Sequence, residues 1–144
     1  MNTFKFWYRW LLVVAFAIIV FGLYIAFFNN TFLFFYFAKF IQQTYHVESP
    51  LLQGLLFKWM FGMLGATMIG WGITIWFVLN NGFLKKQIWA WKALLFATLW
   101  WFTIDSYISF ISNAIFNVAF NAILLISILI PLIMTFKSFH KQNE

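Results

Sequence analysis

A short polar pattern in the last third of the chain contains the residues best suited to chemistry. Asp105 and Ser109 lie four residues apart in an otherwise apolar stretch. Asn113, Asn117 and Asn121 repeat every four residues in the next stretch. Because an α-helix turns once in about 3.6 residues, each set would share one helix face. A carboxyl group at the centre of a membrane helix costs about 2.5–3.5 kcal/mol, so Asp105 needs hydrogen-bond donors, a cation or a proton beside it.

A two-residue polar break separates the two stretches and predicts a tight antiparallel hairpin. With Asn113 as the turn, Asp105 lies eight residues before it and Asn121 eight residues after it. These two positions then sit at equal depth, roughly 12 Å from the turn. Asn117 and Asn121 can donate to the carboxyl group, and Lys58, at the start of an earlier apolar stretch, could also reach it.

Two interpretations of this polar cluster stay open. In the first, it binds or conducts a small ligand or a proton. In the second, its hydrogen bonds only lock the hairpin, at about 0.6 kcal/mol for each interhelical bond. Asparagines alone would supply such bonds without burying an acid, which is the argument for the first interpretation. The expected ligand-binding or proton-binding residues are Asp105, Ser109, Asn117, Asn121 and Lys58.

Other chemistries lack the residues they need. There is no cysteine, which excludes disulfides, thiol nucleophiles and cysteine-based zinc sites. The other two carboxylates, Glu48 and Glu144, are far from Asp105 in sequence, so a paired-carboxylate mechanism in the membrane is not expected. His46 and His140 fall on opposite sides of the predicted membrane and cannot share a haem or metal. We therefore expect no catalytic residue, no metal, no cofactor and no enzymatic activity.

The composition indicates a membrane environment. Hydrophobic residues make up 65% of the chain and charged residues 8%, against about 45–50% and about 25% in soluble domains. Four apolar stretches, 10–28, 59–79, 93–111 and 114–136, have the roughly 20 helical residues that cross a bilayer core of about 30 Å. We expect one all-α membrane domain over residues 1–144, an integral membrane four-helix bundle with up-down-up-down topology.

The segment 31–46, between the first two apolar stretches, has polar residues at helical spacing. Lys39, Gln42, Gln43 and His46 follow the i, i+3, i+4, i+7 pattern of one helix face. We expect an interfacial amphipathic helix on the outer side of the membrane. It would serve either as a cover over the bundle or as a gate over a pocket that opens outward.

The basic residues predict the orientation. If the N-terminus is inside, the outer side carries only Lys39 and Lys58, in agreement with the positive-inside rule. Both termini are then cytoplasmic, and Asp105 lies in the outer half of the membrane. The cations flank apolar stretches and form no stripe with aromatic residues, so the expected partner is the lipid bilayer and not nucleic acid. The inner basic residues are Lys5, Arg9, Lys85, Lys86, Lys92, Lys137 and Lys141.

A stripe of small residues marks the second apolar stretch. Gly62, Ala66 and Gly70 recur every four residues. Small residues at this spacing let two helix backbones approach closely. We expect this face to pack against a helix of the same chain, of a second copy or of another membrane protein. It gives the alternative function, a structural or assembly subunit of a membrane complex.

Local signals predict how two helices end or bend. Asn80-Asn81-Gly82 is expected to end the second helix, with Gly82 at positive φ. Pro131 is expected to bend the fourth helix and to leave the carbonyl group of Ser127 without its helical donor. Most of the nine tryptophans are interpreted as anchors at the membrane interfaces. Those near the predicted boundaries are Trp7, Trp10, Trp76, Trp89 and Trp91 inside and Trp59 outside.

Five stretches of the sequence resemble small four-span bacterial membrane proteins of uncharacterised function. They are GATMIGWG (65–72), WAWKAL (89–94), WFTIDSYIS (101–109), NVAFN (117–121) and IPL (130–132). The resemblance touches the second, third and fourth apolar stretches. It implies a location in the inner membrane of a bacterium, and it brings no activity, cofactor or site residue.

Overall fold

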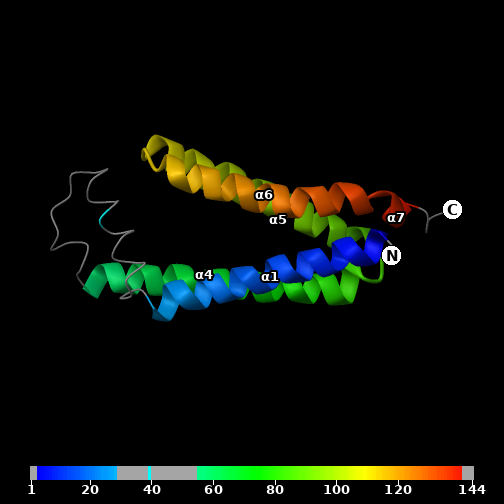
Figure 1. Cartoon of the computed structure of the whole chain (residues 1–144), viewed down its shortest axis with the longest axis horizontal. Coiled ribbons are helices and arrows are strands. Elements are labelled where there is room, and N and C mark those ends of the chain that lie inside the picture. The colour runs from blue at the N-terminus through cyan, green and yellow to red at the C-terminus, as the bar shows by residue number, and fades with distance from the viewer. Residues whose placement is uncertain (1–2, 29–38, 40–54, 141–144) are drawn as a thin grey trace. The chain divides into compact units, whose positions relative to one another are not determined.

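The computed structural model describes residues 3–28, 39 and 55–140, which form helices joined by short turns and include no strand (Figure 1). The long helices are α1 (Thr3–Phe27), α4 (Leu55–Val78), α5 (Ile88–Ile111) and α6 (Ile115–Thr135). A π-helical segment, η1 (Leu79–Phe83), continues α4, and the short helix α7 (Lys137–His140) follows α6. Apart from Lys39, the predicted interfacial segment 31–46 lies outside the described residues.

The described residues contain four helices that are long and apolar enough to cross a membrane. They are Thr3–Phe27, Lys58–Phe83, Ile88–Ile111 and Ile115–Thr135. The predicted number of apolar helices is thus confirmed. The first and third begin at Thr3 and Ile88, earlier than the predicted residues 10 and 93. Lys5 and Arg9 are exposed on α1 and do not interrupt it, because long basic side chains are compatible with a helix.

The chain forms two compact units, and helices α1 and α4 are each divided between them. The first unit comprises Met1–Ala15 and Thr74–Glu144, and the second comprises Phe16–Ile73. The first unit therefore contains the start of α1, the end of α4, and all of η1, α5, α6 and α7. The second unit contains the remainder of α1 and α4.

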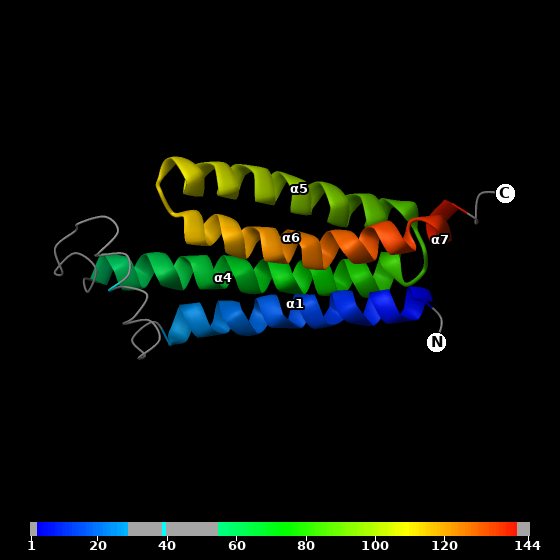
Figure 2. The ribbon, with the colours of Figure 1, turned by 45° about the horizontal axis from the view of Figure 1, so that its top comes forward.

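In the second unit, α1 and α4 approach each other at glycine residues. A Cβ atom added to Gly65 would lie 2.5 Å from the carbonyl oxygen of Gly22 and 2.6 Å from the backbone nitrogen of Ala26. A Cβ atom added to Gly22 would lie 2.8 Å from the carbonyl oxygen of Gly65. No larger residue fits at Gly22 or Gly65 without moving backbone, so these glycines permit the contact. Figure 2 shows α1 and α4 side by side.

The predicted stripe lies on a different face of α4. Ala66 and Gly70 are exposed, and a Cβ atom added at Gly62 or Gly70 would meet no heavy atom within 4 Å. The close approach uses Gly65 instead, which lies about 100° from Ala66 around the helix. Among the described residues, the stripe therefore makes no close contact between helices of this chain. Its packing against a second chain stays a prediction.

In the first unit, three buried rings join the start of α1 to η1 and α7. The ring centroids of Phe4 and Phe83 are 5.6 Å apart, and that of Phe139 lies 4.9 Å from Phe83 and 6.0 Å from Phe4. None of the three residues is more than 8% exposed. Phe139 lies beyond the predicted end of the fourth helix at residue 136. The packed core thus extends further toward the C-terminus than the apolar pattern predicts.

The prediction for Gly82 is wrong. No described glycine has a positive φ, and the left-handed residue after η1 is Lys86, with φ of 56°. The backbone N–H of Lys86 donates to the carbonyl oxygen of Phe83 at 2.9 Å. The N–H of Gln87 donates to the carbonyl oxygen of Gly82 at 3.0 Å, which completes a Schellman motif. Gly82 serves packing instead, because a Cβ atom there would lie 2.6 Å from the Cβ atom of Ala90 and 2.5 Å from the ring of Trp89.

Helix α6 runs through Pro131, and two indole groups donate to its backbone near that residue. Trp10 Nε1 donates to the carbonyl oxygen of Ser127 at 3.0 Å. Trp91 Nε1 donates to the carbonyl oxygen of Leu132 at 2.8 Å. Both tryptophans were expected as interface anchors, and their N–H groups also hold α6 in the first unit.

Candidate ligand-binding site

Helices α5 and α6 form an antiparallel hairpin (Figure 2). Asn113, at the turn, has φ of 56° and donates its backbone N–H to the carbonyl oxygen of Phe110 at 3.1 Å. The N–H of Ala114 donates to the carbonyl oxygen of Ser109 at 2.8 Å. These bonds form a Schellman motif, and asparagine tolerates the left-handed backbone better than most residues. The turn thus fixes the register of α5 against α6.

Asp105 accepts hydrogen bonds from Asn117 and from Asn121, the asparagine that the sequence places at its depth. Asn117 Nδ2 donates to Asp105 Oδ2 at 3.0 Å. Asn121 Nδ2 donates to the same oxygen in a short hydrogen bond. The predicted pairing across the hairpin is therefore confirmed. One carboxylate oxygen of Asp105 receives two amide donors from the facing helix.

Two serines extend the cluster along α5. Ser109 Oγ donates to the backbone carbonyl oxygen of Asp105 at 2.7 Å and accepts from Asn117 Nδ2 at 2.8 Å. Ser106 Oγ accepts from Asn121 Nδ2 at 3.2 Å. Ser106 was absent from the predicted site. Its place directly after Asp105 is the signal that could have found it, because neighbouring helical residues lie about 100° apart and can border the same helix interface.

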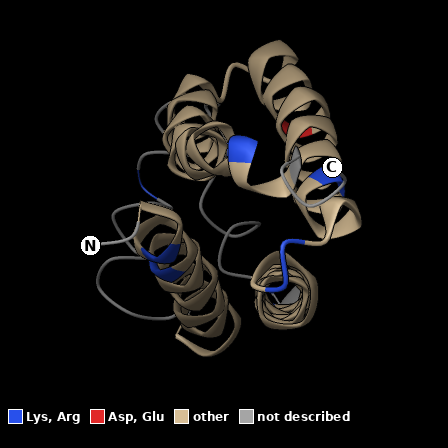
Figure 3. Cartoon of the chain, turned by 90° about the vertical axis from the view of Figure 1, so that its right-hand side faces the viewer, with Lys and Arg blue, Asp and Glu red and all other residues tan. Residues whose placement is uncertain are grey.

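Burial differs among the members of the cluster. Asn121 and Ser109 are 5% and 6% exposed, whereas Asp105 is only half-buried. Of the two amide donors, Asn121 is held in a packed environment, whereas Asn117 is half-buried like the carboxyl group that both contact. Figure 3 marks acidic residues in red, and Asp105 is the single one among the described residues.

The second carboxylate oxygen, Asp105 Oδ1, accepts no hydrogen bond from the described part of the chain. In the same residues, every buried side-chain nitrogen or oxygen atom has a hydrogen-bond partner. Oδ1 is therefore not fully enclosed. The Oδ2 atom of Asp105 is therefore hydrogen-bonded within the hairpin, whereas the Oδ1 atom is open to a further partner.

This arrangement limits what the cluster can bind. Asn117 and Asn121 point N–H donors at Asp105, so Oδ1 is the available acceptor of the carboxyl group. An open carboxylate oxygen can take a proton, a small cation or an N–H donor of a basic ligand. The described residues contain no group of three or more His, Cys, Asp or Glu side chains that could hold a metal ion.

The structure brings together four of the five predicted site residues. Asp105, Ser109, Asn117 and Asn121 form one hydrogen-bonded network. Lys58 is exposed on α4 and belongs to the second compact unit, so its contact with Asp105 stays a prediction. No protein-family model, curated protein or solved structure matches this chain.

Proposed function

We propose that this chain is an integral membrane protein that binds or conducts a proton or a small cationic ligand through Asp105. In this proposal the four apolar helices form a bundle in the inner membrane of a bacterium, with both termini in the cytoplasm. The Asp105 cluster then lies in the outer half of the membrane. The observation that carries the proposal is the open Oδ1 atom beside an Oδ2 atom held by two amides.

The energetic balance favours a functional acid over a merely structural one. Two interhelical hydrogen bonds to Asp105 contribute about 1.2 kcal/mol at the average for such bonds. The cost of placing an aspartate at a membrane helix centre is about 2.5–3.5 kcal/mol, which is an upper bound for Asp105 in the outer half of the membrane. An asparagine at position 105 would keep a hydrogen-bonded hairpin at lower cost. Because the aspartate costs more than its two hydrogen bonds contribute, a species that binds to it explains its presence better than a structural role does.

Charge distribution supports the proposed orientation. Lys5, Arg9, Lys85, Lys86 and Lys92 all belong to the first unit, where each flanks or begins an apolar helix and is exposed. The hairpin turn at the other end of α5 and α6 contains no basic residue. An excess of cations at one end is the pattern of a cytoplasmic face.

Thermal unfolding of the purified protein in detergent tests the binding proposal. The wild type and Asp105→Asn would each be unfolded over a pH series and over a series of lithium, sodium, potassium and ammonium chloride. A species that binds only the folded wild type stabilises it in proportion to the logarithm of its concentration. We expect a dependence on pH or on one cation in the wild type that Asp105→Asn lacks. Equal dependence in both proteins on every species would refute the proposal.

One observation supports the alternative function, that of a structural or assembly subunit. The face of α4 around Gly62 and Ala66 offers a small-residue surface, and a Cβ atom at Gly62 would meet nothing within 4 Å. In this alternative, Gly62→Leu dissociates a complex while leaving the chain folded. Size-exclusion chromatography with light scattering would detect that change in detergent.

A further inference from the structure

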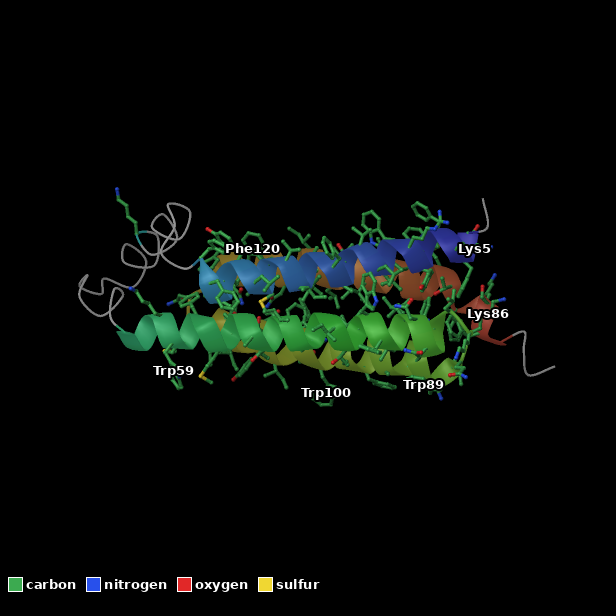
Figure 4. All side chains as sticks on the ribbon, turned by 90° about the horizontal axis from the view of Figure 1, so that it is seen from below. Lys5, Trp59, Lys86, Trp89, Trp100 and Phe120 are labelled. Carbon is green, nitrogen blue, oxygen red and sulfur yellow. The ribbon has the colours of Figure 1, made fainter. Side chains whose placement is uncertain are left out.

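The end of the first unit that carries the buried rings Phe4, Phe83 and Phe139 is strongly basic. Figure 3 looks toward this end and shows the basic residues in blue. Figure 4 shows Lys5 and Lys86 together at this end, with Phe120 toward the opposite end and Trp100 between. The exposed basic residues on or next to the ring-bearing elements are Lys5, Lys85, Lys86 and Lys137.

The three rings join the elements that carry three lysines. Lys5 directly follows Phe4, and Lys137 comes two residues before Phe139. Lys86 comes three residues after Phe83, and its Nζ lies 5.6 Å from the centroid of the Phe4 ring. Because the ring centroids are at most 6.0 Å apart, the elements that carry these lysines are held together by a rigid core.

The charge of these lysines is not balanced within the described residues. None of the three makes an ion pair there. Asp105 is the one acid among the described residues. It lies on α5, 13 residues after Lys92, which is near the start of that helix. This separation is about 20 Å along the helix. Several cations without counter-charges create a positive potential that attracts an anion.

Apolar side chains beside the cations indicate what kind of anion fits. Phe6, next to Lys5, is 40% exposed, and Leu84, next to Lys85, is 44% exposed. Trp89, near the same end, is 51% exposed. A soluble anion would leave these groups uncovered. A phospholipid would place its phosphate among the lysines and its acyl chains along the apolar helix sides.

We infer that Lys5, Lys86 and Lys137 form a binding site for the headgroup of an anionic phospholipid. This site is separate from Asp105 and goes beyond the proposed function. Lipid bound here joins the start of α1, the loop after η1 and α7 through one headgroup. It stabilises the end of the first unit that the three rings hold together.

Native mass spectrometry of the full chain, released from detergent micelles that contain equal amounts of phosphatidylglycerol and phosphatidylcholine, tests this site. We expect the wild type to retain phosphatidylglycerol preferentially. Each lysine near an anionic headgroup contributes about fivefold to affinity. The triple variant Lys5→Gln, Lys86→Gln, Lys137→Gln is therefore expected to bind phosphatidylglycerol about a hundredfold more weakly.

Matched variants separate a defined site from general attraction and from misfolding. Lys39→Gln with Lys58→Gln removes two exposed lysines elsewhere and should keep the preference. The triple Lys→Arg variant keeps the charge and should also keep it, and each single Lys→Gln variant should weaken binding about fivefold. Equal retention of both lipids by the wild type would overturn the inference. An unchanged lipid preference in the single variants would also overturn it, as would an equal loss of preference in the Lys39/Lys58 control. Displacement of the lipid by the same concentration of inorganic phosphate would overturn it too.

Discussion

The indole N–H of Trp10 donates a 3.0 Å hydrogen bond to the carbonyl oxygen of Ser127. Pro131, four residues after Ser127, has no N–H, so α6 itself cannot supply this donor. In a lipid environment water does not replace a missing helical hydrogen bond. A tryptophan on α1 thus satisfies the carbonyl group that a proline on α6 leaves open. Trp10 therefore has a role that its position near a predicted membrane boundary did not reveal.

A double-mutant cycle tests this pairing of Trp10 with Pro131. Trp10→Phe keeps the aromatic ring and removes the donor, and we expect it to lower the free energy of unfolding by about 1 kcal/mol. In a Pro131→Ala background, the introduced alanine supplies its own N–H to Ser127 and the cost of Trp10→Phe should fall toward zero. Urea unfolding in detergent micelles measures both costs. Equal costs in the two backgrounds would show that Trp10 acts through packing alone.

The glycines of α4 should differ sharply in their tolerance of substitution. Gly65→Leu should prevent the approach of α1, because even a Cβ atom would lie 2.5 Å from the Gly22 carbonyl oxygen. We expect a loss of several kcal/mol or failure to fold. Gly62→Leu has open space and should leave the free energy of unfolding of the monomer within about 0.5 kcal/mol. Thermal unfolding of both variants checks this, and equal destabilisation would contradict the observed helix contact.

The backbone at Lys86 predicts a stabilising substitution. Its φ of 56° carries a steric cost for a residue with a Cβ atom, and glycine adopts this φ without that cost. We expect Lys86→Gly to raise the free energy of unfolding by about 0.5–1 kcal/mol in lipid-free detergent. Lys86→Gln is the control for the lost charge and for the contact with Phe4. If Lys86→Gly were as unstable as Lys86→Gln or less stable, the left-handed conformation would not be a source of strain.

Single cysteines in this cysteine-free chain test the orientation. Gln87, exposed before α5, should be cytoplasmic, and Gln43, in the segment outside the described residues, should be external. An impermeant maleimide added to intact cells should label Gln43→Cys and not Gln87→Cys. Labelling should be equal after the cells are opened. The reverse pattern would place both termini outside.

The polar hairpin could be predicted because its geometry follows from local spacing. Asn113 ends α5 in a left-handed turn, and the eight-residue distances to Asp105 and Asn121 then follow from helix rise alone. No knowledge of other helices was needed. Pro131 and Ser127 are a similar case, because proline always lacks the N–H that its i−4 carbonyl group needs.

The helix contact on α4 could not be predicted in the same way. Gly65 and the stripe of Gly62 and Ala66 offer two small-residue faces about 100° apart, and the choice between them depends on the partner helix. Gly22 and Ala26 on α1 are also four residues apart, and matching this pair to Gly65 would have identified the contact. A small-residue pattern therefore predicts a contact only when both helices are considered together.

The turn after η1 shows a different reason for failure. Gly82 carries the usual signal for a left-handed residue, yet the left-handed residue is Lys86. Gly82 instead lies against Trp89, a contact between segments that no local pattern encodes. Lysine has no preference for the left-handed conformation, so its position there depends on the tertiary packing of η1 against α5.

We propose that Asp105 exchanges a proton or a cation at its open carboxylate oxygen, and infrared difference spectroscopy observes that group directly. Films of the protein reconstituted in lipid would be exposed in turn to a pH series and to lithium, sodium, potassium and ammonium ions. The wild type should show a carboxyl or carboxylate band that responds to pH or to one cation. That band should be absent from Asp105→Asn, whose free energy of unfolding should be unchanged or raised because a partly buried acid is removed. Identical difference spectra for the wild type and a well-folded Asp105→Asn protein under all these conditions would contradict the claim.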